Sequence, residues 1–527
     1  LGGANATLLT GANASVAIGY QAAGNASGNW GNGVYIGYLA GNHDINGGNV
    51  AIGYRAMEVA SGSQMVQNTA VGTQAMNNIS NDNSNANTAI GYHALKGGAV
   101  TSNVQYNVAI GSSNLSNITT GINNVAIGGV SALSGLTTGA NNVALSRGAG
   151  QTLTTTSDCI LIGSDAGNTL DGTGPNGSIA IGKLALATHT DGVRNVAIGW
   201  EAMHDTNAGS TSQGSNDNVF IGYSAAGGVW ANAESNGNVG IGSYVMDSAL
   251  DGALYNTAVG AYALSAITSA DNVVAIGNSA AYSLTTGANN VAIGTNAMKV
   301  HTTGERNMAI GTNAMDDTDA GSTSLGSADN IFMGHNAGGG TWTDVASNRN
   351  VTLGNYTMDA ATAGALDNVA VGHYALSSIT SGDYNTVLGS NAGLSITTGA
   401  NNICIGYLAG DTMTGNGAVI AIGTSAGQAI NHTDADGTVA IGFKALENLT
   451  NGQNNLAIGQ ETLKGITTGN NNIAIGKLAM DDFDAGVNSG NSSQNIAIGT
   501  NAMGGTATNV ACNDNIAIGA NTMAAAL

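Results

Sequence analysis

The sequence predicts an all-β fold, a parallel β-solenoid (β-roll) of about 28 coils of 16–23 residues. The first observation behind this prediction is the phrase Asn-Val-Ala-Ile-Gly, which returns in 28 identical or varied copies that end between Gly19 and Gly519. The second is their spacing of 16 to 20 residues, with three gaps of 23. The third is composition, because only 8% of the 527 residues are charged and 81 are glycine, whereas globular domains carry about 25% charged residues. Such repeats are typical of solenoids.

The Val-Ala-Ile segment of each copy predicts a short strand. Its β-branched residues favour extended backbone, and the glycine that follows ends the run. Side chains alternate between the two faces of a strand, so Val and Ile share one face and Ala lies on the other. A helix is disfavoured by the many glycines and by the lack of a sustained 3.6-residue period.

The rest of each coil follows the consensus N-[VI]-A-I-G-x-x-A-[LM]-x-x-[LI]-T-T-G-x-N. Its Leu, Met and Ile positions supply further apolar side chains, and the Thr-Thr-Gly segment predicts a tight corner at which glycine takes a positive φ. One copy is degraded and reads Val143-Ala144-Leu145-Ser146. A single coil is too small to fold alone, so it must stack on its neighbours, with like side chains in columns about 4.8 Å apart.

Two columns lead to specific predictions. The residue before Val is Asn in 21 of the 28 copies, and these amides are expected to hydrogen-bond from coil to coil. The middle strand residue is Ala in 20 copies, which predicts close packing against a second chain. This interprotomer face contains Ala126, Ala292, Ala309 and Ala474, and the contact would widen at Tyr35, Leu161, Phe220, Phe332 and Cys404. The alternative is a two-layer interior that buries the column within one chain.

A longer period lies over the coils. The spacings 23, 20, 18, 17, 17 and 17 define two 112-residue super-repeats, 199–310 and 311–422, with a partial third copy from 476. Since no linker separates them, residues 1–527 are predicted to form a single continuous β-solenoid. The 23-residue coils exceed the common 17 by six residues, which are best placed in surface loops. We predict recognition loops there, with these aromatic candidates: Trp230, Trp342, Phe220 and Phe332.

Composition disfavours several function classes. A formal charge of −21 with only 11 Lys plus Arg leaves no basic patch for nucleic acid, and no run of about 18 apolar residues predicts membrane insertion. The eight histidines form no catalytic motif, so we expect no enzyme and no cofactor. Two acidic runs could bind Ca²⁺ through carboxylate oxygens, but both also fit solvated corners: Asp316-Asp317-Thr318-Asp319 and Asp481-Asp482-Phe483-Asp484.

The phrase NNVAIGxxA resembles the N-S-V-A-I-G-x-x-S/A repeat of trimeric autotransporter adhesin heads, related forms of which occur in bacteriophage tail-fibre and other virion fibre proteins. The likeness runs from Val16 to Gly519. It implies a left-handed roll, a homotrimer around a threefold axis and adhesion rather than catalysis. The coils here are longer than is usual in that family, and the 527 residues contain no segment that resembles the family's neck, stalk or membrane barrel. The I-G-x-x-A unit also resembles left-handed β-helix acyltransferases, whose coils need 18 residues, whereas 17 dominates here.

The expected function is therefore a non-enzymatic extracellular structural or adhesive fibre on a cell surface or virion. It would form the shaft or head of a phage tail fibre or bacterial appendage and bind a host-surface glycan or protein receptor through its loops. One alternative is an extracellular filament that grows head to tail. We expect this because neither end of the sequence shows the pattern of a polar capping coil, so the end coils could stack on those of another chain. A lesser alternative is a carbohydrate-active tailspike, which would require a catalytic carboxylate pair.

Overall fold

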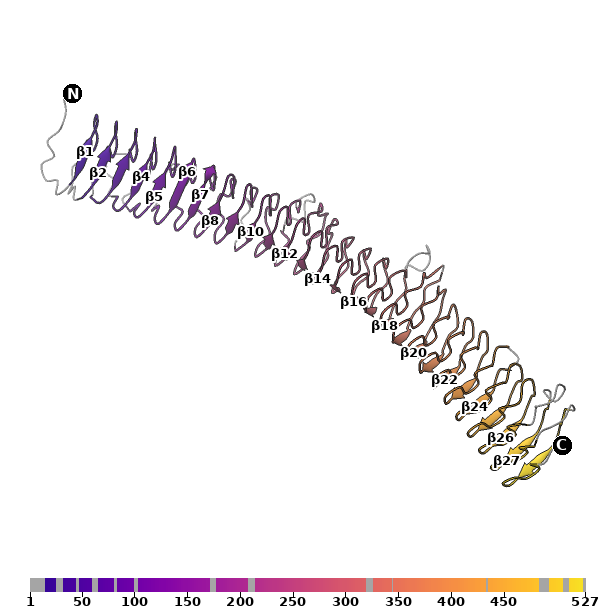
Figure 1. Ribbon diagram of the computed structural model, residues 1–527. Helices are drawn as coiled ribbons and strands as arrows, with labels where there is room; N and C mark the ends of the chain where they lie inside the picture. The colour runs from indigo at the N-terminus through magenta and orange to yellow at the C-terminus, as the bar shows by residue number, and fades with distance from the viewer. Residues whose placement is uncertain are drawn as a thin grey trace. The chain divides into compact units, whose positions relative to one another are not determined.

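The computed structural model comprises two compact units, residues 1–269 and 270–527. Each unit is a parallel β-solenoid in which every coil contributes one strand (Figure 1), as the repeats predict. The single continuous domain remains a prediction. The structure describes residues 15–24, 32–43, 47–58, 65–79, 83–98, 103–170, 177–206, 214–318, 326–343, 345–432, 435–482, 492–505 and 511–524.

Within its described residues the first unit has 14 strands, which pair consecutively and in parallel. All have three residues except β6 and β7. They are β1 (Val16–Ile18), β2 (Val34–Ile36), β3 (Val50–Ile52), β4 (Thr69–Val71), β5 (Thr88–Ile90), β6 (Val108–Ser112), β7 (Val125–Val130), β8 (Val143–Leu145), β9 (Ile160–Ile162), β10 (Ile179–Ile181), β11 (Val196–Ile198), β12 (Val219–Ile221), β13 (Val239–Ile241) and β14 (Thr257–Val259).

The described part of the second unit also has 14 strands, each of three residues, paired in the same way. They are β15 (Val274–Ile276), β16 (Val291–Ile293), β17 (Met308–Ile310), β18 (Ile331–Met333), β19 (Val351–Leu353), β20 (Val369–Val371), β21 (Thr386–Leu388), β22 (Ile403–Ile405), β23 (Ile420–Ile422), β24 (Val439–Ile441), β25 (Leu456–Ile458), β26 (Ile473–Ile475), β27 (Ile496–Ile498) and β28 (Ile516–Ile518). None of the described residues forms a helix that could span a membrane.

The alanine column faces the interior of each coil, so the predicted interprotomer face at this column is wrong. Its four named members have no solvent exposure within the single chain: Ala126, Ala292, Ala309 and Ala474. A Cβ placed on Gly427, in the Leu/Met column, would lie 3.5 Å from the Ala421 Cβ. The two columns therefore face each other across a narrow, close-packed interior, and another chain cannot reach the alanines. This is the two-layer alternative.

The glycine that closes the repeated phrase forms its own column, in which Ser146 is the one exception among the described strands. Its φ lies between +123° and +148° wherever it is positive, a region that only glycine occupies readily. A Cβ on Gly294 would lie 2.4 Å from the carbonyl oxygen of Gly311 in the next coil. The Thr-Thr-Gly glycine differs from the prediction, since Gly287 has no positive φ. It is required instead because a Cβ there would lie 2.1 Å from the Gly304 carbonyl oxygen.

The predicted asparagine ladder is confirmed. Asn124 Nδ2 donates hydrogen bonds to Asn107 Oδ1 (3.1 Å) and to the Gly139 carbonyl (2.9 Å). Its Oδ1 accepts from the backbone N and the Nδ2 of Asn142, both at 3.0 Å. All three amides are buried. Each asparagine thus joins two coils and also satisfies a corner carbonyl of the next coil, which buried backbone polar groups require.

Candidate functional site

The four aromatic residues predicted for receptor contact lie in the interior. Phe220 and Trp230 pack with their ring centroids 6.2 Å apart, and Phe332 and Trp342 with theirs 5.7 Å apart. All four have no solvent exposure, so they fill the coils and cannot touch a receptor. Their prediction as recognition residues is wrong. The inserted segments of the 23-residue coils, 207–213, 319–325 and 483–491, lie outside the described residues.

Larger residues in the alanine column are accommodated by glycine within the same coil. A Cβ on Gly41 would lie 2.1 Å from Tyr35, and one on Gly338 would lie 2.7 Å from Phe332. Five coils share this spacing of six residues between a large residue and a glycine: Tyr35/Gly41, Leu161/Gly167, Phe332/Gly338, Val387/Gly393 and Cys404/Gly410. These residues therefore mark a changed interior and not a wider interchain contact. This pairing of a large residue with a glycine is visible in the sequence. It would have indicated that the alanine column lies inside the coil.

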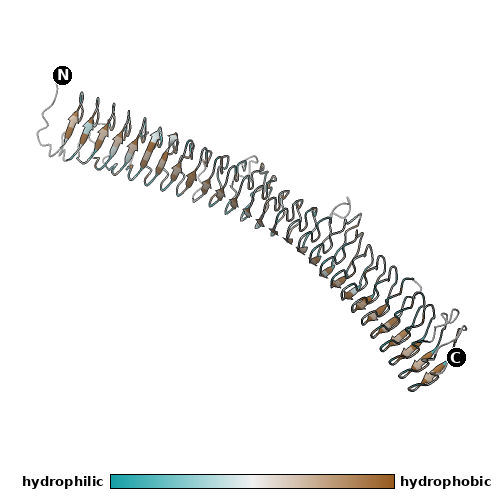
Figure 2. Ribbon diagram, viewed as in Figure 1, coloured by the Kyte–Doolittle hydropathy of each residue, from teal (hydrophilic) through white to brown (hydrophobic). Residues whose placement is uncertain are grey.

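The first and third residues of each strand face outward and form what we term the outer sheet face. They are mostly Val and Ile, and the strands are accordingly brown in Figure 2. Many remain between 37% and 51% exposed despite neighbours on both sides, among them Ile90, Ile127, Ile241, Val259, Ile276, Val351, Leu353 and Leu388. In both units this face is a strip rich in partly exposed apolar side chains, interrupted at its first position by Thr69, Thr88, Thr257 and Thr386.

A second exposed feature was missed from the sequence. Ten of the 15 tyrosines follow a strand-ending glycine by one or two residues, at a position we term the glycine corner. Tyr20, Tyr38 and Tyr54 stack there with centroids 5.3 and 5.4 Å apart, and each is about half exposed. Tyr244 stacks on Tyr262 in the same way at 5.2 Å. The repeated Gly-Tyr pair was the signal for this aromatic ridge.

The acidic runs do not assemble into a metal centre in the described part of the chain, where no group of three or more His, Cys, Asp or Glu residues could hold an ion. Burial and the nearby carboxylates of Asp317 and Asp359 raise the pKa of Asp316 to about 6. Burial, followed by the charge of Asp482, likewise raises the pKa of Asp481. Asp319 and Asp484 lie outside the described residues. Ca²⁺ binding therefore stays an untested prediction.

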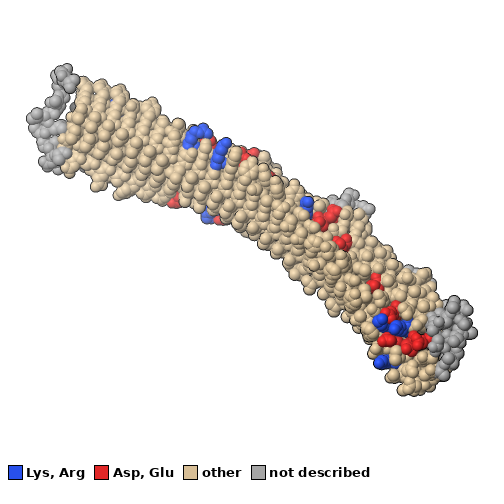
Figure 3. Space-filling model, in the orientation of Figure 1, with Lys and Arg blue, Asp and Glu red and all other residues tan. Residues whose placement is uncertain are grey.

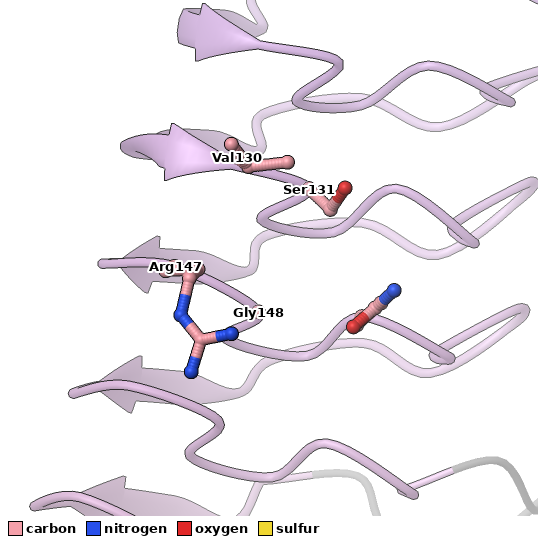
Figure 4. A pocket seen from close by; sticks show the side chains of 5 residues that line it. Val130, Ser131, Arg147 and Gly148 are labelled. Atoms are coloured by element: carbon pink, nitrogen blue, oxygen red, sulfur yellow. The ribbon is translucent and has the colours of Figure 1, made fainter.

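One cavity interrupts the regular surface of the first unit. It has a volume of about 240 Å³ and lies at β7 and β8, and we term it the Arg147 pocket. Val130 and Ser131 come from one coil, and Arg147 and Gly148 come from the next (Figure 4). Gln151 completes the lining. Its lining brings together a guanidinium, a hydroxyl and an amide group.

A buried histidine replaces the usual Leu or Ile before one Thr-Thr-type corner. His189 Nε2 lies 3.0 Å from Asn195 Nδ2, and His189 Nδ1 lies 2.9 Å from the Thr206 hydroxyl. Since the amide of Asn195 donates to it, the ring is neutral with its proton on Nδ1. Burial without a carboxylate partner lowers the pKa of His189 to about 4. His301 makes the same contacts with Asn307 and Thr318 at 3.1 and 2.9 Å.

We expect the first unit to lose stability in mild acid through His189. The unfolded imidazole titrates near pH 6.5 and the folded one near 4, so the unfolded state binds the proton more strongly. The contribution of His189 to the free energy of unfolding is constant above about pH 6.5. It falls by about 3 kcal/mol as the pH drops to 4 and does not change further below that pH. The His189→Leu variant should lose this component. Hydrogen exchange of residues 177–206 at pH 7 and pH 4.5 measures it, and equal pH dependence in both proteins would contradict the assignment.

Comparison with known proteins adds no family: no protein-family model matches the chain, and no curated protein matches it.

Proposed function

We propose that the chain is a non-enzymatic extracellular adhesive fibre, forming the shaft or head of a phage tail fibre or bacterial surface appendage, and that its left-handed rolls assemble as a homotrimer. The observation that carries this proposal is the outer sheet face. Coil after coil adds two partly exposed aliphatic residues to the same strip, for example Val351 and Leu353 in β19. Monomeric soluble proteins rarely leave a long apolar strip uncovered.

A second copy of the chain is the occupant that best fits this face. The columns of one chain repeat at the coil spacing, so an identical column can pack against them along its whole length with the same period. Figure 3 shows charged side chains gathered in a few groups on an otherwise tan surface, and the chain has only 8% charged residues. The resemblance to trimeric adhesin heads supplies the number three. The proposed interface between chains is therefore the outer sheet face, on the side of the strand opposite to the alanine column.

The adhesive role rests on the same resemblance and on the exposed chemistry. The glycine corner offers half-exposed tyrosine rings with hydroxyl groups, which suit contact with sugars or proteins because one end of the ring is apolar and the other polar. The net charge of −21 keeps such assemblies soluble and disfavours nucleic acid as a partner. The partners proposed are therefore further copies of the chain and a host-surface glycan or protein.

Attachment can be measured directly. The chain is displayed on a non-adherent bacterium, and retention under flow is recorded on immobilised glycans, matrix proteins and host cells. We expect retention on at least one surface well above that of bacteria without the chain. Equal retention on every surface would remove the adhesive role. If the purified chain also grew into polymers with concentration, the head-to-tail filament would replace it.

A further inference from the structure

The coils at β6, β7 and β8 break the repeat that all neighbouring coils obey. Between the pairs Ile110/Ile127 and Ser112/Val130, β6 contributes one residue and β7 contributes two, which is a β-bulge caused by the extra Gly129. In the next coil Ser146 replaces the strand-ending glycine and has a φ of +119°, a conformation that residues with a Cβ avoid. Bulges and strained residues cluster beside functional sites.

A buried asparagine supports the bulge. Asn114 stands where the consensus has Ala, and it has no solvent exposure. Its Nδ2 donates to the carbonyls of Ile110 (2.7 Å) and Gly128 (3.2 Å), and its Oδ1 accepts from the backbone N of Ala132 (2.8 Å). These bonds satisfy backbone groups around the extra residue. The irregular coil is therefore a specified structure with its own compensating residue and is not an accidental loss of the repeat.

The Arg147 pocket lies beside this irregularity, and the following coil orients its cation. Arg147 Nη2 donates to Ser164 Oγ (3.1 Å) and Asp165 Oδ2 (2.8 Å). Gly148 permits this arrangement, because a Cβ there would lie 2.3 Å from Asp165 Oδ1. A guanidinium has five N–H donors, and Nη2 supplies only two. In the described part of the chain, Nε and Nη1 of Arg147 make no hydrogen bond, and neither does the side chain of Gln151.

We propose that the Arg147 pocket binds the carboxylate of a hexuronate residue in a surface glycan. The proposal rests on the adhesive function above and names the class of its ligand. The free N–H donors of Arg147 pair with the carboxylate through charge-assisted hydrogen bonds. The Ser131 hydroxyl and the Gln151 amide face ring hydroxyls, and Val130 packs on the apolar C–H face of the ring. A volume of about 240 Å³ is enough for one six-membered ring of the glycan.

Titration calorimetry with two methyl glycosides tests this ligand class. Methyl β-D-glucuronide and methyl β-D-glucoside differ only by a carboxylate in place of a hydroxymethyl group. We expect the glucuronide to bind at least tenfold more tightly to the intact protein, with an affinity that falls as salt rises. Equal affinities, or no binding of either glycoside, would overturn the proposal.

Three variants connect the binding to this cavity. Arg147→Gln should weaken glucuronide binding at least tenfold, whereas Arg194→Gln, at an equally exposed arginine paired with Asp217 on a regular coil, should not change it. Removing Gly129 together with Asn114→Ala restores the consensus coil and should abolish binding with the thermal midpoint maintained or raised. Undiminished binding in Arg147→Gln or in the restored coil would contradict the assignment. Glucuronide binding without retention in the flow assay would count against the adhesive function alone.

Discussion

Substitution of Gly294 by Ala is expected to lower the local free energy of unfolding by about 4 kcal/mol, the sum of backbone strain and overpacking. Gly294 has a φ of +135°, and an added Cβ would lie 2.4 Å from the carbonyl oxygen of Gly311. Neither group can move without breaking the coil register, because Gly311 N also donates to the carbonyl of Ile293 (2.7 Å). Coils stabilise one another only through their neighbours, so the effect should be concentrated around β16 and β17.

Hydrogen exchange with peptide resolution measures this effect, because the loss is local and global unfolding of a long repeat protein is not two-state. Peptides from 274–311 should exchange far faster in the variant. Gly326→Ala is the matched control, since a Cβ there meets no atom of the described residues within 4 Å and its φ is not positive. Equal protection in Gly294→Ala and the control would show that the glycine column does not set the coil spacing.

Two lysines on the outer sheet face are expected to dissociate the proposed trimer completely. Leu353 and Leu388 are 51% and 48% exposed in the single chain, so the Leu353→Lys, Leu388→Lys variant should fold normally. In the trimer the same positions would bury unpaired ammonium groups, each of which costs about 3–5 kcal/mol. Three chains bring six such groups to one interface, which exceeds the stability of most assemblies.

Sedimentation velocity at one protein concentration measures this dissociation. The double variant should sediment as a single chain, whereas Val345→Lys, which changes a 52% exposed residue outside the strands, should sediment as the parent does. An unchanged coefficient for the double variant would place the interface elsewhere, and a monomeric control variant would show that the effect is not specific to the outer sheet face.

Much of the fold follows from the sequence because stacking forces identical positions into columns. The strand at each Val-Ala-Ile, the parallel in-register pairing and the asparagine ladder all follow from the repeat and from backbone hydrogen bonding. The degraded copy Val143–Ser146 also marks the place in the sequence where the coils become irregular. The sequence did not reveal the cavity beside these coils. The bulge there depends on one extra residue, Gly129, and on hydrogen bonds from the buried amide of Asn114 to backbone groups of two coils.

The direction of the strand faces could not be read from alternation alone. A pattern of period two states that Val and Ala point in opposite directions but not which of them points inward. The usual expectation, that the larger aliphatic residue is buried, fails because the coil is too thin for it. The pairing of a large residue with a glycine six positions later, as in Tyr35/Gly41 and Cys404/Gly410, shows which face is inside. The glycine leaves room for the large side chain in the interior of the coil. Trp230 and Trp342 are buried in the same interior, where they pack on Phe220 and Phe332.

The assembly state is the central claim, and the solution mass of the purified chain, measured by light scattering across a dilution series, tests it most directly. The outer sheet face predicts a constant mass of three chains, about three times 51.8 kDa, at every concentration. A mass of one chain throughout would contradict the homotrimer and leave the apolar strip without the partner assigned to it here.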